Sequence, residues 1–219
     1  MVEVSTSILS ADKDNSLGVF YNLEVAKTDY FHIDVMDGKF VKNNTVDLMQ
    51  SYCGQIRQVS NLPLDVHFMV NDVKTYIDSY IPFEPNTITF HLEACKNKEE
   101  VFELINYIKE NNIKVGISIK PNTAVEELYK YLPYIHSVLI MTVEPGYGGQ
   151  KLIPETINKV KFLKEYIEEN NIEIDIEVDG GVNLENVEKL KEAGANIIVA
   201  GTAILKENDY KEIIEKIKK

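Results

Sequence analysis

Short runs of β-branched and apolar residues recur along the chain and predict eight strands. We place these strands at residues 4–9, 30–36, 63–70, 86–93, 114–120, 137–143, 172–179 and 196–201. Longer segments with apolar residues at helical spacing lie between them, most clearly at 98–112, 155–171 and 184–195, and a last one lies at 210–219. Residues 10–29 show only a weak helical pattern.

Strict alternation of strands and helices predicts a parallel sheet built from right-handed βαβ units. Eight such units in 219 residues fit a closed barrel better than an open sheet. No linker, low-complexity tract or change of composition divides the chain. The pattern therefore predicts an α/β protein, a single (β/α)8 TIM barrel with parallel strands that occupies residues 1–219 as one domain. Asn183 is expected to begin the helix after the seventh strand, and Gly194 to end it.

Two of the predicted strands have histidine, aspartate and methionine side chains on one face and apolar side chains on the other. Successive side chains of a strand point to opposite faces, so the segment 30–36 has an apolar face and a face with imidazole, carboxylate and thioether groups. The segment 63–70 repeats this pattern. The six residues on these two imidazole- and carboxylate-bearing faces are His32, Asp34, Met36, Asp65, His67 and Met69.

Three of these residues, together with an aspartate at the end of the seventh strand, form a candidate metal site: His32, Asp34, His67 and Asp179. They lie toward the C-terminal ends of three different strands, which is where barrels of this kind carry their chemistry. Imidazole and carboxylate ligands suit one divalent ion, Zn²⁺, Fe²⁺, Mn²⁺ or Co²⁺, and ligand type does not choose among them. The alternative is a set of hydrogen-bonded polar groups inside the barrel. His91 has the parity of a fifth ligand, but we leave it out because a satisfied interior histidine is more common.

The seventh strand raises a second question of parity. If Asp179 points into the barrel, Glu177 does too, and a buried carboxylate needs a partner or a proton. Lys120, near the end of the fifth strand, is one candidate partner.

Glycine-rich stretches follow the last three strands: "VEPGYGGQ" (143–150), "DGGV" (179–182) and "AGT" (200–202). Backbone N–H groups in such turns form anion-binding nests, and the loops after strands seven and eight of a barrel commonly hold a phosphate. Arg57 is the only arginine, so backbone groups and the Thr202 hydroxyl would hold the phosphate. Three ordinary tight turns are the alternative.

Composition narrows the classes of partner. The net charge is −12 and no basic patch stands out, so nucleic acid is not expected. No apolar stretch approaches the length of a membrane span, and no signal peptide is visible, so no membrane association is expected. Cys53 and Cys95 lack metal-site spacing and are expected to be free thiols. We expect a cytoplasmic protein.

The motifs "SILSAD", "HIDVMDGKFV", "DVHFMV", "MTVEPGYGGQ", "EVDGGV" and "AGTAI" resemble those of the ribulose-phosphate 3-epimerase family. The resemblance runs from Ser7 to Ile204 and implies epimerisation at C3 of a ketose phosphate, D-ribulose 5-phosphate to D-xylulose 5-phosphate, in the pentose phosphate pathway. It implies that Asp34 and Asp179 are both metal ligands and the acid/base pair, working through an enediolate. Thr6, Lys42, Phe68 and Thr202 depart from the commonest motifs, and Lys42 alters a loop near the mouth.

The resemblance also implies which residues contact the substrate and that the protein forms a homo-oligomer. The implied substrate contacts are Ser7, His67, Met36, Met69, Met141, Gly146, Tyr147, Gly148, Gly149, Gly180, Gly181, Gly201 and Thr202. The methionines would form a dry wall around the reacting carbon, although core packing is their simpler role.

Three rival functions stay open at this point. An allulose-6-phosphate 3-epimerase performs the same chemistry on a six-carbon sugar. A phosphosugar-binding barrel without catalysis is a second rival. A decarboxylase or synthase is the third, but it leaves the two histidines and two carboxylates unexplained.

Overall fold

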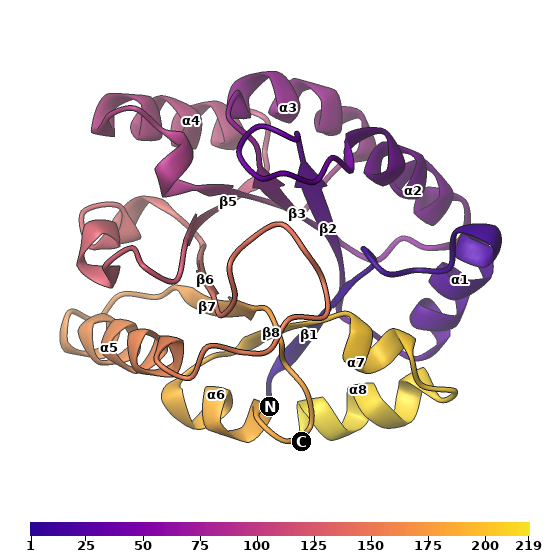
Figure 1. Cartoon of the computed structure of the whole chain (residues 1–219). Coiled ribbons are helices and arrows are strands. Elements are labelled where there is room, and N and C mark those ends of the chain that lie inside the picture. The colour runs from indigo at the N-terminus through magenta and orange to yellow at the C-terminus, as the bar shows by residue number, and fades with distance from the viewer.

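Eight parallel strands close one barrel in the order β1 to β8, as the computed structural model of residues 1–219 shows (Figure 1). The predicted fold class is confirmed. The strands are β1 (Glu3–Ser7), β2 (Tyr30–Met36), β3 (Leu64–Met69), β4 (Thr87–His91), β5 (Lys114–Ile119), β6 (Ser137–Met141), β7 (Asp175–Asp179) and β8 (Ile197–Ala200).

A ring of helices surrounds the barrel (Figure 1). The α-helices are α1 (Ser16–Val25), α2 (Val46–Val59), α3 (Val73–Tyr80), α4 (Lys98–Glu110), α5 (Thr156–Glu169), α6 (Val187–Ala193), α7 (Thr202–Leu205) and α8 (Tyr210–Lys218). Short 3-10 helices complete the connections: η1 (Lys13–Asn15), η2 (Ile81–Phe83), η3 (Leu92–Ala94), η4 (Val125–Leu128) and η5 (Leu132–Tyr134).

The prediction of strict alternation is wrong at one connection. Only η4 and η5 join β5 to β6, and Pro133 within η5 cannot donate a backbone hydrogen bond to extend a helix. The Asn183 prediction is also wrong, because α6 starts at Val187 after Asn186, and Asn183 lies in the preceding turn. Gly194 does end this helix, in the left-handed conformation that glycine adopts without strain.

The apolar core lies between the strands and the helices. Phe31, Ile33 and Val35, the outward residues of β2, are fully buried and belong to one hydrophobic cluster of 54 residues. Burying one such side chain contributes roughly 1.5–3 kcal/mol to folding. This shell therefore stabilises the barrel, and the interior of the barrel is free to carry polar groups.

The register of β2 and β3 builds the polar interior. His32 pairs with Asp65, Asp34 with His67, and Met36 with Met69, so the imidazole- and carboxylate-bearing faces of the two strands lie side by side. Because the two strands are parallel, Asp34 lies beside His67, and His32 lies one inward position before Asp34 on the same strand.

Two smaller expectations concern cysteines and membranes. Cys53 and Cys95 are free thiols, as predicted. No helix combines the length and apolar character that a bilayer span requires.

Gly116 on β5 leaves space that the barrel interior needs. A Cβ atom added there would collide with the Thr89 hydroxyl and lie 2.8 Å from Ser137 Oγ. We predict that Gly116→Ala lowers the free energy of unfolding by about 1–3 kcal/mol, as overpacking does. Urea denaturation measures this change.

Gly54 in α2 is the matched control, because a Cβ atom there meets nothing within 4 Å. Gly54→Ala should raise stability by roughly 0.4–1 kcal/mol, since alanine restricts the unfolded chain. Equal stability of Gly116→Ala and the wild type would contradict the packing argument.

Candidate active site

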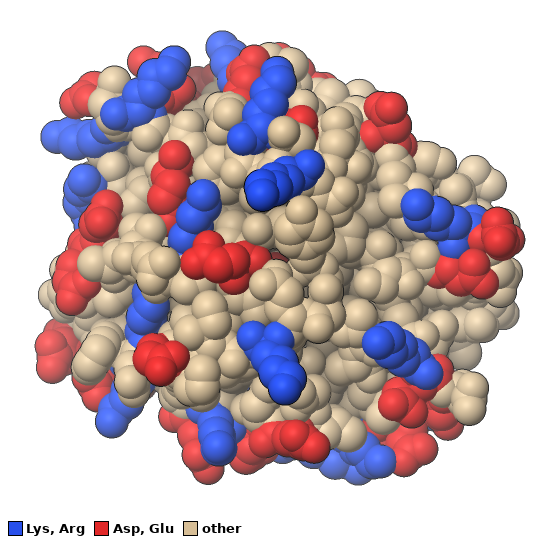
Figure 2. All heavy atoms as spheres, viewed as in Figure 1, with Lys and Arg blue, Asp and Glu red and all other residues tan.

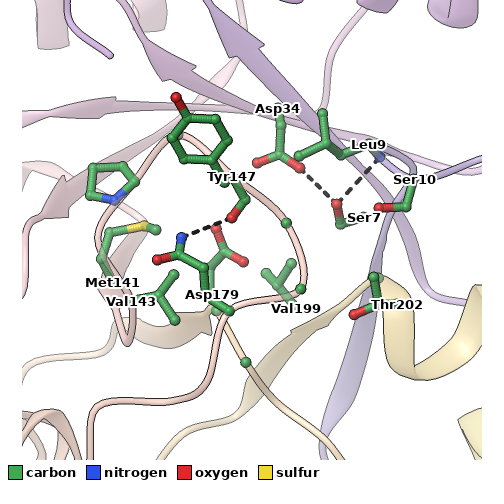
Figure 3. A pocket seen from close by; sticks show the side chains of 18 of the residues that line it. Ser7, Leu9, Ser10, Asp34, Met141, Val143, Tyr147, Asp179, Val199 and Thr202 are labelled. Carbon is green, nitrogen blue, oxygen red and sulfur yellow. Dashed lines mark hydrogen bonds between the residues drawn. The ribbon is translucent and has the colours of Figure 1, made fainter. Parts of the chain in front are cut away.

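A cleft opens at the C-terminal ends of the strands, where the chemistry was predicted. Figure 3 shows Asp34 and Ser7 on one wall, with Asp179 and Met141 facing them. Of the predicted site residues, those that line the cleft are Ser7, Asp34, Met36, Met69, Met141, Gly146, Tyr147, Gly148, Gly149, Asp179, Gly180, Gly181, Gly201 and Thr202. His32 and His67 lie fully buried beneath it.

The four predicted metal ligands converge on one point. One ligand atom from each of His32, Asp34, His67 and Asp179 lies within 4.8 Å of the other three. His32 Nε2 is 3.5 Å from Asp34 Oδ1 and 3.9 Å from Asp179 Oδ2. His67 Nδ1 is 3.7 Å and 3.8 Å from the same two oxygens.

Each histidine directs an unpartnered nitrogen at this point. His32 Nδ1 lies 2.6 Å from Asp65 Oδ2, which leaves its buried Nε2 without a hydrogen bond. His67 Nε2 lies 3.0 Å from His91 Nε2, which leaves its buried Nδ1 without one. Buried polar atoms are rarely left without a partner, so these two nitrogens fit a group, such as a cation, that both can bind.

The two aspartates differ in their electrostatic surroundings. Burial would raise the pKa of Asp34, but His32 and His67 outweigh it and hold that pKa far below its ordinary value. Burial and the neighbouring Asp34 raise the pKa of Asp179 to about 6, against the opposing effect of the histidines. Asp34 therefore favours the anionic form, and Asp179 accepts a proton more readily than an ordinary aspartate.

These groups fit a divalent cation. Ligand atoms about 2.1 Å from a tetrahedral ion are about 3.4 Å apart, close to the spacing seen here. Burial would lower the pKa of His32, yet Asp65 and Asp34 raise it well above 6.5. The site thus carries a negative potential, and metal binding would displace protons from it.

Ser7 orients Asp34. Its hydroxyl donates to Asp34 Oδ2 over 2.7 Å, which leaves Oδ1 facing the two histidines (Figure 3). The substrate contact predicted for Ser7 stays a prediction. In this structure Ser7 lines the cleft and its hydroxyl donates a hydrogen bond to the Asp34 carboxylate.

A second buried group lies below the candidate metal site. Glu177 Oε1 is 3.6 Å from His32 Nδ1, and burial together with Asp65 raises the pKa of Glu177 well above its ordinary value. The raised pKa favours the protonated form of Glu177, which is neutral and therefore costs less to bury than a carboxylate. Lys120 is not its partner, because Lys120 Nζ lies 4.0 Å above the Phe40 ring at the barrel mouth.

Sequence reasoning left three residues out of the site. Asp65 and His91 each hydrogen-bond a proposed histidine ligand, and Glu93 bonds His91 in turn. Strand parity was the available signal, since Asp65 shares a face with His67, and His91 with Thr89. Parity alone does not show which interior polar groups touch.

The three glycine-rich loops line the same cleft. The loop after β6 arches over the barrel mouth, and Gln150 holds it by donating to the carbonyl groups of Glu144 and Tyr147 (Figure 1). Gly181 has φ 68°, and a Cβ atom there would lie 2.8 Å from Gln150 O. Only glycine allows the turn after β7 to pack this closely against the loop after β6.

Charge on this face does not form a broad binding surface. Lysines and acidic residues are scattered over this face, with tan areas between them (Figure 2). An anion at the glycine-rich end would therefore be recognised locally, by backbone N–H groups.

Comparison with known proteins gives a consistent result. Residues 3–205 match the sequence profile of the Ribulose-phosphate 3 epimerase family. The chain is 38% identical over 219 residues to ribulose-phosphate 3-epimerase of Bacillus subtilis, covering all of this chain and 99% of that protein. The corresponding enzyme of Methanocaldococcus jannaschii is 36% identical over 218 residues, covering 100% and 90% of the two chains.

Solved structures with distant sequences share the fold. A 3-hexulose-6-phosphate synthase from Salmonella typhimurium superposes with a TM-score of 0.70 at 13% identity, covering 99% of this chain and 96% of that one. A phosphoribosyl anthranilate isomerase from Thermococcus kodakaraensis gives 0.64 at 13% identity, covering 99% and 97%.

We predict that Asp179→Asn weakens Zn²⁺ binding by more than the ~10–100-fold typical of residues outside the ligand shell. Asp179 supplies a ligand oxygen, and an amide binds Zn²⁺ poorly. Competition with a chromophoric chelator measures the affinity of the metal-free chain.

Asp175→Asn is the matched control, because Asp175 begins the same strand and its Oδ1 bonds Asn196 instead. This variant should bind Zn²⁺ like the wild type. Equal affinity of Asp179→Asn and Asp175→Asn would remove Asp179 from the ligand set.

Proposed function

The chain belongs to the ribulose-phosphate 3-epimerase family, and we propose that it interconverts D-ribulose 5-phosphate and D-xylulose 5-phosphate by inverting C3 at a divalent metal site. The observation that carries the mechanism is the approach of Asp34 and Asp179 to the same pair of unpartnered imidazole nitrogens.

Inversion at C3 requires proton transfer on both faces of the sugar. The C3 proton lies next to the C2 carbonyl, and its removal gives a planar enediolate. Asp34 and Asp179 come from β2 and β7, which β1 and β8 separate, so they approach the cleft from different sides. A carboxylate on one side can take the proton while a carboxylic acid on the other side donates one.

The contrast between the pKa values of the two aspartates supports different roles for them. The low pKa of Asp34 favours a carboxylate, and the pKa of about 6 brings the gain and loss of a proton by Asp179 closer to neutral pH than for an ordinary aspartate. Asp34 is the base and Asp179 the acid in one direction, and the roles exchange in reverse. Positioned proton transfer of this kind contributes roughly 10²–10⁴-fold to the rate.

The metal and the apolar wall address the charge that develops on the sugar. A divalent ion held by His32, Asp34, His67 and Asp179 would supply Lewis-acid stabilisation of oxygen charge beside C3. Met36, Met69 and Met141 are at most 2% exposed and line the cleft. Their thioethers keep water from the reacting carbon, which strengthens the electrostatic terms.

The glycine-rich end would hold the phosphate of the substrate. Gly146 to Gly149, Gly180, Gly181 and Gly201 line the cleft with Thr202, and their backbones can approach an anion closely. This arrangement fits a chain with a single arginine, because Arg57 bonds backbone carbonyls of Leu62, Phe83 and Glu84 instead.

Association into a homo-oligomer is part of the proposal. Leu17, Tyr21 and Val25 lie four residues apart along α1 and are 42%, 56% and 57% exposed. Such a stripe supports association through this helix.

Incubation with D-ribulose 5-phosphate in D₂O tests the function. We expect D-xylulose 5-phosphate to form with deuterium at C3, because the proton returned comes from an enzyme acid that exchanges with solvent. NMR of the sugar follows both changes. A chain that binds the sugar without deuterium entry would be a binding barrel and not an enzyme.

Two comparisons sharpen this test. Comparing kcat/KM on allulose 6-phosphate with that on ribulose 5-phosphate distinguishes the six-carbon alternative. Asp34→Asn and Asp179→Asn should each lose roughly 10²-fold or more in kcat, while Asp175→Asn should keep full turnover. Normal turnover in either site variant would remove that aspartate from the mechanism.

Thr202→Val tests the phosphate end separately. Loss of one hydrogen bond to a charged group costs about 1.5–3 kcal/mol, so KM should rise roughly 10–100-fold while kcat changes little. Steady-state kinetics measures both constants. A fall in kcat at constant KM would place Thr202 near the reacting carbon rather than the phosphate.

A further inference from the structure

A series of hydrogen bonds leads from His67 on β3 away from the candidate metal site to His91 at the end of the neighbouring strand β4 and to Glu93 in η3. His67 Nε2 lies 3.0 Å from His91 Nε2, and His91 Nδ1 lies 3.1 Å from Glu93 Oε2. We propose that His91 and Glu93 are positioning residues, which hold the proton of His67 on Nε2 and so keep Nδ1 free to bind the metal. This inference rests on the metal site of the proposed function.

The direction of these hydrogen bonds follows from what each group can donate. A carboxylate accepts only, so Glu93 requires the His91 proton on Nδ1. Nε2 of a neutral His91 then has a lone pair and accepts from His67. The His67 proton must therefore lie on Nε2, and the lone pair of Nδ1 faces Asp34 and Asp179.

Glu93 is anchored to hold this direction. Its Oε1 accepts from the Lys120 backbone N–H at 2.7 Å and from the Thr123 hydroxyl. The remaining oxygen, Oε2, is thus held toward His91. The connection between β5 and β6 fixes the carboxylate, although this connection does not line the cleft.

The imidazole rings are sealed from water. His67 and His91 are fully buried, and their ring centroids are 5.0 Å apart. The Phe40 ring covers His91 with centroids 4.9 Å apart, and Lys120 lies above Phe40. His67 Nε2 thus has no contact with bulk solvent, and His91 Nε2 is its hydrogen-bond partner.

The arrangement parallels that of His32, the other histidine of the candidate metal site. His32 Nδ1 bonds the Asp65 carboxylate directly, and its Nε2 faces the site. His67 uses the opposite nitrogen and reaches its carboxylate through a second ring. Outer partners of this kind orient metal ligands and raise their basicity.

Long-range ¹H–¹⁵N spectra of the full chain test the proposal directly, because the ring nitrogens report where each proton lies. In the metal-free and the Zn²⁺-loaded wild type, we expect His67 to carry its proton on Nε2 and His91 on Nδ1. Any other placement overturns the proposal. This readout needs no variant, so it survives if a variant fails to fold.

Glu93→Gln should remove the constraint on the ring protons of His91 and His67, because an amide can donate as well as accept. We expect a mixed proton placement on His67 in the metal-free variant and Zn²⁺ affinity lower by about 10–100-fold. Unchanged affinity with unchanged ring protons would overturn the role of Glu93.

Two controls separate this role from charge and from loop structure. Glu127→Gln removes the same charge from an exposed site in η4 and should change neither readout. Thr123→Val removes one of the two loop contacts of Glu93 Oε1 and keeps the one from the Lys120 N–H, so it should also leave both readouts unchanged. If Thr123→Val weakens Zn²⁺ as much as Glu93→Gln, Glu93 acts through the loop and the proposal fails.

The outcomes also separate this inference from the proposed function. A wild-type chain that binds no Zn²⁺ would overturn the metal centre, whereas the ring protons would still be measurable. Normal Zn²⁺ binding with the wrong ring protons would overturn the positioning role of His91 and Glu93 alone.

Discussion

The active-site architecture depends on two buried carboxylates held close to each other by the groups around them. Asp34 and Asp179 both lie within 4 Å of the same two imidazole nitrogens. Two anions in a poorly solvated interior repel each other, so one must take a proton or a cation must lie between them. The raised pKa of Asp179 is the first response, and the unpartnered nitrogens of His32 and His67 indicate the second. The proposed acid/base chemistry and the proposed metal binding would thus both follow from one electrostatic constraint.

In this barrel, the residues that stabilise the fold and the residues that carry titratable groups lie in different layers. The shell between strands and helices is apolar and holds the 54-residue cluster, while the inward faces of β2, β3, β4 and β7 carry titratable groups. The interior groups orient one another through Asp65 for His32 and through His91 and Glu93 for His67. Packing therefore supplies the free energy of folding, and the interior supplies directed ligands.

The cleft separates two kinds of recognition along its length. In the proposed function, side chains from β2, β3 and β7 would act on the reacting carbon, and loop backbones that line the same cleft would hold the phosphate. Backbone N–H groups need no charged side chains, which suits a strongly acidic chain with one arginine. The glycines of these loops permit the close packing on which such a site relies, as Gly181 against Gln150 shows.

The sequence alone determined the barrel, the inward parity of His32, Asp34 and His67, and the glycine-rich end, because period-two alternation and turn chemistry are local. It did not determine the partner of Glu177, the inclusion of His91 and Asp65, or the helix-poor link between β5 and β6. Lys120 was a candidate partner by strand position, yet it lies at the mouth over Phe40. Contacts between side chains of different strands depend on strand register and barrel closure. Only the tertiary structure decides these, because they fix which groups meet across the interior after the chain has folded.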